Sequence, residues 1–280
     1  MGYKTIVLHL DASRQRRQCL EVAFEQAGRF DAHLVGLYAP GPPFVPSPAL
    51  GEIGPTALEF ETRNRKAAAQ AAQEAFREAS ARHPAVKCEW RASNGDAVAA
   101  ACLSARYADL FIAGQPQFRD ADAGVIAPVF AADVLLTSGR PVLFVPYAGT
   151  FPKVGHRVLI AWNASPEAAR AVSDALPILK GASRVEVTAF DPDSLNSHHG
   201  DVPGADIGLF LARHGIKVSV TQQTGSGLDV GLQLLSRAAD QSADLIVMGA
   251  YGHSRLREWI LGGATQTLLE SMTVPVLMSH

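Results

Sequence analysis

The sequence predicts an α/β protein made of two tandem doubly wound domains, each with a five-stranded parallel sheet that helices cover on both faces. Short apolar runs alternate with helical patterns along the whole chain, and strands joined by helices run parallel. The same series of elements occurs twice. Hydrophobic residues make up 48% of the 280 residues, which is enough to bury two cores.

Three segments of the first half recur in the second half in the same order. The separation between partners shrinks after the first pair, so the first half carries an insertion. The insertion is predicted at 40–55, which is rich in Pro and Gly, and the linker between the halves at 147–156. The matching segments are Thr5–Ser13 with Arg157–Ser165, Ala108–Gly114 with Ala243–Gly249, and Arg140–Val145 with Thr273–Met278.

The elements of the first half follow from short apolar runs and from the helical periods between them. The runs show little alternation, as expected of strands whose two faces are both covered. Ser13 is predicted to cap the first helix and Asp96 the third. Strands are expected near 4–10, 32–38, 86–91, 109–114 and 141–145, and helices near 14–29, 57–82, 95–106 and 126–137.

The second half repeats this series after the linker. Ser165 is predicted to cap a helix that begins at Pro166. Proline is well suited to the first position of a helix, because the backbone N–H that it lacks would make no hydrogen bond within the helix there. The loop 225–231 resembles a dinucleotide-binding loop, but its third glycine comes one place late, so we interpret it as a helix-capping loop. Strands are expected near 156–162, 184–190, 216–221, 244–249 and 275–279, and helices near 166–179, 202–214, 228–241 and 263–271.

The charge balance gives no electrostatic reason to expect a nucleic acid or a membrane surface as a partner. Charged residues make up 19% of the chain, and the net charge is −2. Cys19, Cys88 and Cys102 are scattered without the spacing of metal ligands, which fits a reducing compartment. The chain has no apolar run of about 18 residues and no signal-peptide pattern, so we expect a soluble cytoplasmic protein.

A glycine-spaced stretch near the end of the chain indicates a ligand. Gly249 and Gly252 follow an apolar run, and nine residues later Gly262 and Gly263 precede a helical pattern that starts at Thr265. Glycines let the backbone approach a phosphate closely, and the free N–H groups of a helix start attract negative charge. The stretch follows a predicted strand, and the carboxyl ends of strands are where doubly wound sheets bind ligands.

This arrangement resembles the universal stress protein family in its tandem two-domain form. The nucleotide-binding signature of that family is Gly, two residues, Gly, nine residues, Gly, then Ser or Thr, and Gly249, Gly252 and Gly262 match it in place. The resemblance implies two flavodoxin-like domains, at 1–147 and 156–280, which pack together as two subunits do in a single-domain relative.

The resemblance further implies that the last strands of the two domains, Pro141–Val145 and Pro275–Met278, pair across the interface. It implies that the second domain binds ATP or another adenine nucleotide, with or without Mg²⁺. In such relatives the adenine lies near the ends of the first two strands, and the phosphates lie over the glycine stretch and the next helix. The residues implied for this site are Ala161, Trp162, Asn163, Phe190, Asp191, Gly249, Gly252, His253, Gly262, Gly263, Ala264 and Thr265.

The two domains depart from the family pattern to different degrees. In the second domain, Gly263 stands where relatives have Ser or Thr, which removes a hydrogen bond worth roughly 0.5–1.5 kcal/mol. Asn163 stands in the place of the usual Asp. In the first domain, Gln117 replaces the second glycine and Pro116 removes a backbone donor. We therefore expect the first domain to keep the fold and to bind no nucleotide.

No catalytic or metal-ligating residue is assigned, so the implied role is a stress sensor or regulator with, at most, slow ATP hydrolysis. Trp162 fits either a pocket wall or a contact between domains, and the pair at 198–199 fits a solvated loop better than a metal site. One alternative function is a structural or interaction stress protein that binds no nucleotide. Another is a weak ATPase or an ATP-dependent transferase, although the chain has no P-loop. Homodimer formation and a protein partner stay open.

Overall fold

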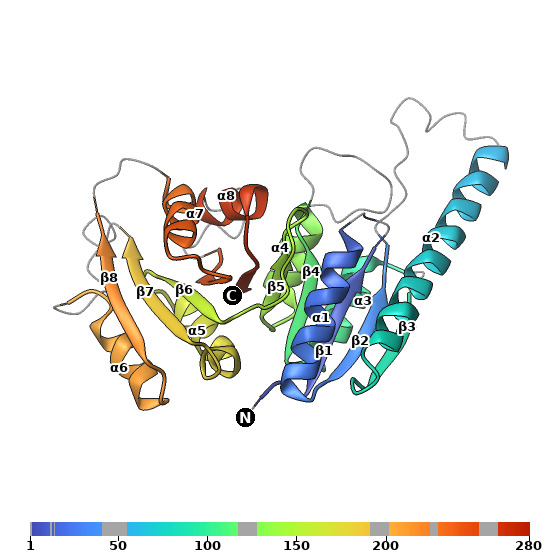
Figure 1. Cartoon of the computed structure of the whole chain (residues 1–280). Coiled ribbons are helices and arrows are strands. Elements are labelled where there is room, and N and C mark those ends of the chain that lie inside the picture. The colour runs from blue at the N-terminus through green and yellow to red at the C-terminus, as the bar shows by residue number, and fades with distance from the viewer. Residues whose placement is uncertain are drawn as a thin grey trace.

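The computed structural model describes residues 2–11, 13, 15–40, 55–93, 95–116, 128–190, 202–224, 229–251 and 263–280. Ten strands form one continuous sheet in the order β3-β2-β1-β4-β5-β10-β9-β6-β7-β8 (Figure 1). The strands are β1 (Thr5–Leu10), β2 (His33–Tyr38), β3 (Cys88–Ala92), β4 (Leu110–Gly114), β5 (Val142–Val145), β6 (Arg157–Trp162), β7 (Arg184–Phe190), β8 (Val218–Gln223), β9 (Leu245–Gly249) and β10 (Val276–Ser279).

Each half contributes five mutually parallel strands, which confirms the predicted α/β class with two tandem doubly wound units. The halves join where β5 pairs antiparallel with β10, with Val142 opposite Met278 and Phe144 opposite Val276. This confirms the predicted pairing of the last strands. Because that pairing is antiparallel, the strands of the first half point their carboxyl ends opposite to those of the second half.

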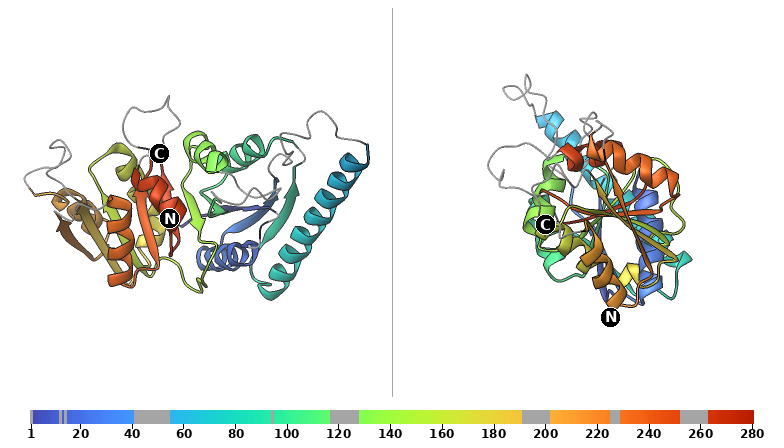
Figure 2. Two further views of the ribbon diagram at one scale, coloured as in Figure 1. Left: turned by 90° about the horizontal axis from the view of Figure 1, so that it is seen from above. Right: turned by 90° about the vertical axis from the view of Figure 1, so that its left-hand side faces the viewer.

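Eight described helices cover the two faces of the sheet (Figure 2). One face is covered by α1 (Arg16–Phe30), α2 (Pro55–Arg82), α5 (Pro166–Leu179) and α6 (Ala205–Arg213). The other is covered by α3 (Ala97–Arg106), α4 (Pro128–Thr137), α7 (Val230–Asp240) and α8 (Gly263–Ser271). Successive residues of a central strand enter opposite layers, as Leu8 and Val7 of β1 do, so these strands are apolar throughout.

The two edge strands differ from the expectation that both strand faces are covered. Strand β8 contains half-buried and exposed residues but no buried one, and β3 becomes exposed at Arg91 and Ala92. The physical reason is their position, because an edge strand has a neighbour on one side only. Figure 1 also shows that α2, with 28 residues, runs past the end of the sheet.

Capping side chains fix several helix starts. The Ser165 hydroxyl accepts a hydrogen bond from the Ala168 N–H at 3.1 Å, and the Asp96 carboxylate accepts one from the Ala99 N–H at 2.7 Å, so both predicted caps are confirmed. The Ser13 cap was predicted wrongly, because α1 begins only at Arg16 and has no side-chain cap. The Asp11 carboxylate instead accepts from the Ser13 N–H at 2.9 Å and holds the chain in a turn before the helix.

Gln115 ties the first half to α8 of the second half. Its side-chain nitrogen donates to the main-chain carbonyls of Leu269 at 2.9 Å and Glu270 at 3.1 Å, and its side-chain oxygen accepts from the Tyr147 N–H at 3.1 Å. Its own carbonyl accepts from Gln15 Nε2 at 2.9 Å. Gln115 is 1% exposed, so these bonds are made in a buried setting at the end of β4.

The linker between the halves is itself packed into the molecule. Val154 is buried, and its carbonyl accepts from Gln26 Nε2 at 3.1 Å and from Arg29 Nη1 at 2.8 Å. Asp244, which precedes β9, accepts from the N–H groups of Gly155 and His156 at 2.8 and 2.9 Å. Across the described ranges, no helix has the length and apolar character needed to cross a membrane.

Candidate functional site

The candidate site lies at the carboxyl ends of the central strands of the second half. Strand β6 pairs with β7 on one side and with β9 on the other, so the chain winds away from it in both directions. This is the switch point at which doubly wound sheets bind ligands. Ala161 lies opposite Met248 of β9, and Trp162 lies opposite Ala189 of β7. The structure thus brings the predicted residues of β6, β7 and β9 together at one edge.

The residues that end β6 and β7 provide a half-open surface. Ala161 and Trp162 are half-buried, and Trp162 packs against the core on the α5 face. Asn163 is exposed, and its side-chain oxygen accepts from the Ser165 N–H at 3.1 Å. The Phe190 side chain is buried in the opposite layer, so only its backbone reaches the strand end.

Gly249, the last residue of β9, lies directly against the start of α5. A Cβ atom at this position would come within 2.4 Å of the Ala168 nitrogen and 2.6 Å of the Glu167 carbonyl carbon. The glycine therefore has a packing role that is independent of any ligand, because it lets the start of α5 rest on the strand end. This close approach brings the first turn of α5 to the candidate site.

The start of α8 lies at the same edge. Gly263 is exposed, Ala264 is half-buried and Thr265 is buried, and the first turn contains no acidic residue. Unpaired N–H groups at a helix start favour an anion. Of the predicted residues in this turn, Gly263 and Ala264 therefore reach the surface and Thr265 does not. Of the other predicted residues, Asp191, Gly252, His253 and Gly262 lie outside the described residues, as do the histidines at 198–199.

Two acidic residues at this site were not singled out from the sequence. Asp229 caps α7 by accepting from the Gly231 N–H at 2.8 Å, and its other oxygen lies 3.2 Å from where a Cβ of Gly263 would be. Glu167, in the first turn of α5, has a buried Oε2 without a hydrogen-bond partner. A sequence shows an acidic residue at a helix start, but it does not show that two such helix starts meet at one edge.

Tyr251 also belongs to this edge and was not predicted. Its backbone is left-handed, with φ of 60°, which is rare for a residue with a large side chain. Its buried hydroxyl has no hydrogen-bond partner. Burial raises the pKa of Tyr251, and Asp133 of α4 raises it further, so the phenol stays protonated at neutral pH. Within the described ranges, no group of three His, Cys, Asp or Glu residues is placed to hold a metal.

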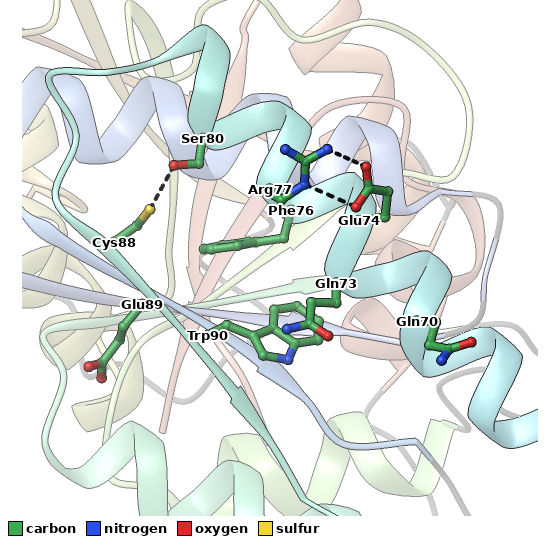
Figure 3. Close-up of a pocket in the computed structure, with 9 residues that line it drawn as sticks. All are labelled: Gln70, Gln73, Glu74, Phe76, Arg77, Ser80, Cys88, Glu89 and Trp90. Carbon is green, nitrogen blue, oxygen red and sulfur yellow. Dashed lines mark hydrogen bonds and ion pairs between the residues drawn. The ribbon is translucent and has the colours of Figure 1, made fainter.

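A hollow of about 530 Å³ lies elsewhere, between α2 and β3. Figure 3 shows Phe76 and Trp90 between the helix and the strand, with ring centroids 5.5 Å apart. Among the side chains drawn there, Arg77 pairs with Glu74 and Ser80 with Cys88. The hollow lies beside an edge strand, away from the switch points, so we do not assign the ligand site to it.

The fold defines a tandem pair of doubly wound α/β domains, with the candidate site at the strand ends of the second. A model of the universal stress protein family matches residues 2–146 and again residues 155–280, so the chain belongs to the universal stress protein family in its tandem two-domain form. A universal stress protein from Archaeoglobus fulgidus shares the fold, with a TM-score of 0.67 and 19% identity over 98% of this chain and 95% of that one.

Two further relatives match smaller parts. A universal stress protein from Synechocystis is 32% identical over 74 residues, which are 24% of this chain and 26% of that protein. The match therefore spans about a quarter of the length of this curated relative. A universal stress protein solved in complex with cAMP is 21% identical and covers 53% of this chain and 100% of its own, with a TM-score of 0.36.

Proposed function

We propose that the second domain binds ATP or another adenine nucleotide at this edge and acts as a stress sensor or regulator in the cytoplasm. The observation that carries the proposal is the position of α8. Its start has Gly263 exposed and no acidic residue in the first turn. Because α8 connects the parallel strands β9 and β10, this start lies on the side of the carboxyl ends of the strands of the second half. A helix start there offers N–H donors to phosphate, and the neighbouring strand ends offer backbone to a base.

Other features of the edge fit a nucleotide. The unpartnered Glu167 Oε2 is a buried acceptor that a ribose hydroxyl or an adenine amino group would satisfy. The complex of a relative with cAMP suggests adenine nucleotides as the ligands to test first.

The proposed cytoplasmic location is consistent with the free cysteines Cys19, Cys88 and Cys102, which fit a reducing compartment.

A second candidate function is a structural stress protein that binds no nucleotide. The observation in its favour is the carboxylate of Asp229 beside Gly263, which opposes a phosphate at the start of α8. The missing hydroxyl at Gly263 acts in the same direction. These two features weaken binding of a phosphate without removing the N–H groups that attract it.

Titration with ATP tests the proposal. At a concentration a hundred times Kd, ATP should raise the free energy of unfolding by about 2.7 kcal/mol, which thermal or urea denaturation detects. AMP and cAMP serve as parallel ligands, and GTP serves as a test of base specificity. If no adenine nucleotide raises the stability at millimolar concentration, the structural alternative holds.

Replacing Asp229 by asparagine should strengthen nucleotide binding. Asn caps helices as well as Asp does, so the bonds to the Gly231 and Leu232 N–H groups remain while the negative charge disappears. Removing one partly screened charge near a phosphate is worth about 1 kcal/mol, or roughly a fivefold gain in affinity. Isothermal calorimetry at low and high salt measures the gain, which should shrink as salt increases. An affinity that is unchanged at low salt would place the phosphate away from Asp229.

A further inference from the structure

The first half carries a buried polar cluster at the carboxyl end of β1, which the nucleotide proposal does not use. We name His9, Asp11, Ser13 and Gln15 the β1 polar cluster. These side chains are 3%, 5%, 5% and 3% exposed, respectively. Strand β1 pairs with β2 on one side and β4 on the other, so the cluster lies at the switch point of the first half.

Three atoms of the cluster are buried without a hydrogen-bond partner: His9 Nδ1, Ser13 Oγ and Gln15 Oε1. Buried polar atoms in folded proteins nearly always have a partner, because each unpaired one costs free energy. Three at one switch point therefore need an explanation. His9 lies in β1, and Ser13 and Gln15 lie between β1 and α1, so the three atoms come from adjoining positions of one strand end.

The chemistry of these atoms follows from the bonds around them. His9 Nε2 lies 2.8 Å from the Ala39 carbonyl, and Gln15 Nε2 donates to the Gln115 carbonyl at 2.9 Å. A carbonyl only accepts, so both nitrogens carry hydrogens, and the atoms left over, His9 Nδ1 and Gln15 Oε1, are acceptors. Burial lowers the pKa of His9, although the Asp11 charge partly opposes this, so the neutral ring keeps a lone pair on Nδ1.

We propose that the β1 polar cluster binds a small neutral molecule that carries N–H or O–H donors, of the amide or polyol class, and that it rejects phosphate. The acceptors His9 Nδ1 and Gln15 Oε1 would receive those donors, with the Ser13 hydroxyl able to donate or accept. A phosphate offers acceptors and negative charge, which this set and the Asp11 carboxylate oppose. The site is separate from the edge of the second half and does not depend on nucleotide binding there.

The second half supplies a natural comparison for each residue. Ala161 stands at the repeat position of His9, and Ser165 at that of Ser13. The Ser165 hydroxyl is already used as the cap of α5, whereas the Ser13 hydroxyl caps nothing. The two halves thus differ in chemistry at equivalent places, with buried unpaired polar atoms in the first and a helix-capping hydroxyl in the second.

The test uses the full chain and the side-chain nitrogen resonances of histidine. His9 is assigned among the 9 histidines by its loss in His9→Gln. Acetamide and glycerol are titrated separately, so that amide and hydroxyl donors are distinguished, and inorganic phosphate is the negative control. We expect acetamide or glycerol to shift His9 Nδ1, with saturation, and phosphate to leave it unchanged.

Two serine variants complete the test. Ser13→Ala should weaken the probe by roughly tenfold, because it removes one hydrogen bond, while leaving the melting temperature of the free protein the same or higher. Ser165→Ala should lower the melting temperature and leave the probe affinity unchanged, because it removes a helix cap in the other half. The proposal is overturned if neither probe shifts His9 Nδ1, which leaves water alone as the partner. A shift with phosphate, or an affinity that Ser13→Ala does not change, also overturns it.

Discussion

We expect Gly249→Ala to lower the free energy of unfolding by about 3 kcal/mol, which is the upper end of the usual cost of adding one carbon to a packed interior. The added Cβ would come within 2.4 Å of the Ala168 nitrogen and 2.6 Å of the Glu167 carbonyl carbon. Both atoms are helix backbone, which has no rotamer to change, so α5 must move away from the end of β9. Urea denaturation of the full chain measures the loss.

The matched control is Gly114→Ala, at the repeat position in the first half. There the Cβ would meet the end of the Gln15 side chain, with Nε2 at 2.5 Å. A flexible side chain can turn aside, so the expected loss is only the hydrogen bond to the Gln115 carbonyl, about 1 kcal/mol. Equal losses from the two variants would contradict the different packing of α1 and α5.

We expect Gln115→Met to lower the free energy of unfolding by about 2–3 kcal/mol and to weaken ATP binding. Gln115 contacts the end of α8, whereas the proposed phosphate position is at the start of that helix. Methionine keeps the length and volume of the side chain, so packing is largely retained. It removes the two bonds to the carbonyls of Leu269 and Glu270 and the bond from the Tyr147 N–H. Those carbonyls end α8, the helix whose start we propose for phosphate.

The control compares two effects of the variant: the decrease in its free energy of unfolding in the absence of ATP, and the decrease in its affinity for ATP. Denaturation measures the first and calorimetry the second, at a temperature where the variant is fully folded. A variant that loses stability but keeps the wild-type affinity would show that Gln115 only holds the halves together. If the variant is as stable as the wild type, the hydrogen bonds of the Gln115 side chain do not contribute to stability as we expect.

Much of the fold follows from local sequence. The predicted bounds of all ten strands lie within a few residues of the observed ones. The central strands follow from apolar runs, because a strand buried on both faces needs a largely apolar sequence. The repeat of segments around Pro141 and Pro275 indicated two equivalent units, and the family resemblance indicated which strands join them. Strand β8 was harder, because exposure at a sheet edge depends on strand order.

The misplaced Ser13 cap shows where local reasoning stops. Ser13 and Ser165 occupy equivalent positions in the repeat, and each follows an alanine at the end of a strand pattern. The bond from the Ser13 N–H to Asp11 has a counterpart in the bond from the Ser165 N–H to Asn163, so it does not account for the difference. In the first half α1 starts later, at Arg16, with the Gln15 side chain turned toward Gly114. The choice between the two turns depends on contacts with another strand, which a short pattern does not contain.

The candidate site was predicted in part for the same reason. The glycine spacing singled out Gly249 and Gly263, because glycines near a helix start let backbone N–H groups approach a phosphate closely. It did not reveal Asp229 beside Gly263 or the buried oxygen of Glu167, which come from other helix starts. Gln115 was not singled out from the sequence, whereas in the structure it bonds to a helix of the other half.

Helix α8 has one consequence for regulation. With nine residues it is about 13 Å long, and it reaches from the Gln115 side chain to the proposed phosphate position. Gln15, a member of the β1 polar cluster, bonds to Gln115 in turn. A small molecule held by Gln15 and a nucleotide held at Gly263 would therefore act on opposite ends of one rigid element. Thermodynamic linkage then requires reciprocity, so the factor by which the first changes the affinity of the second equals the factor in the reverse direction.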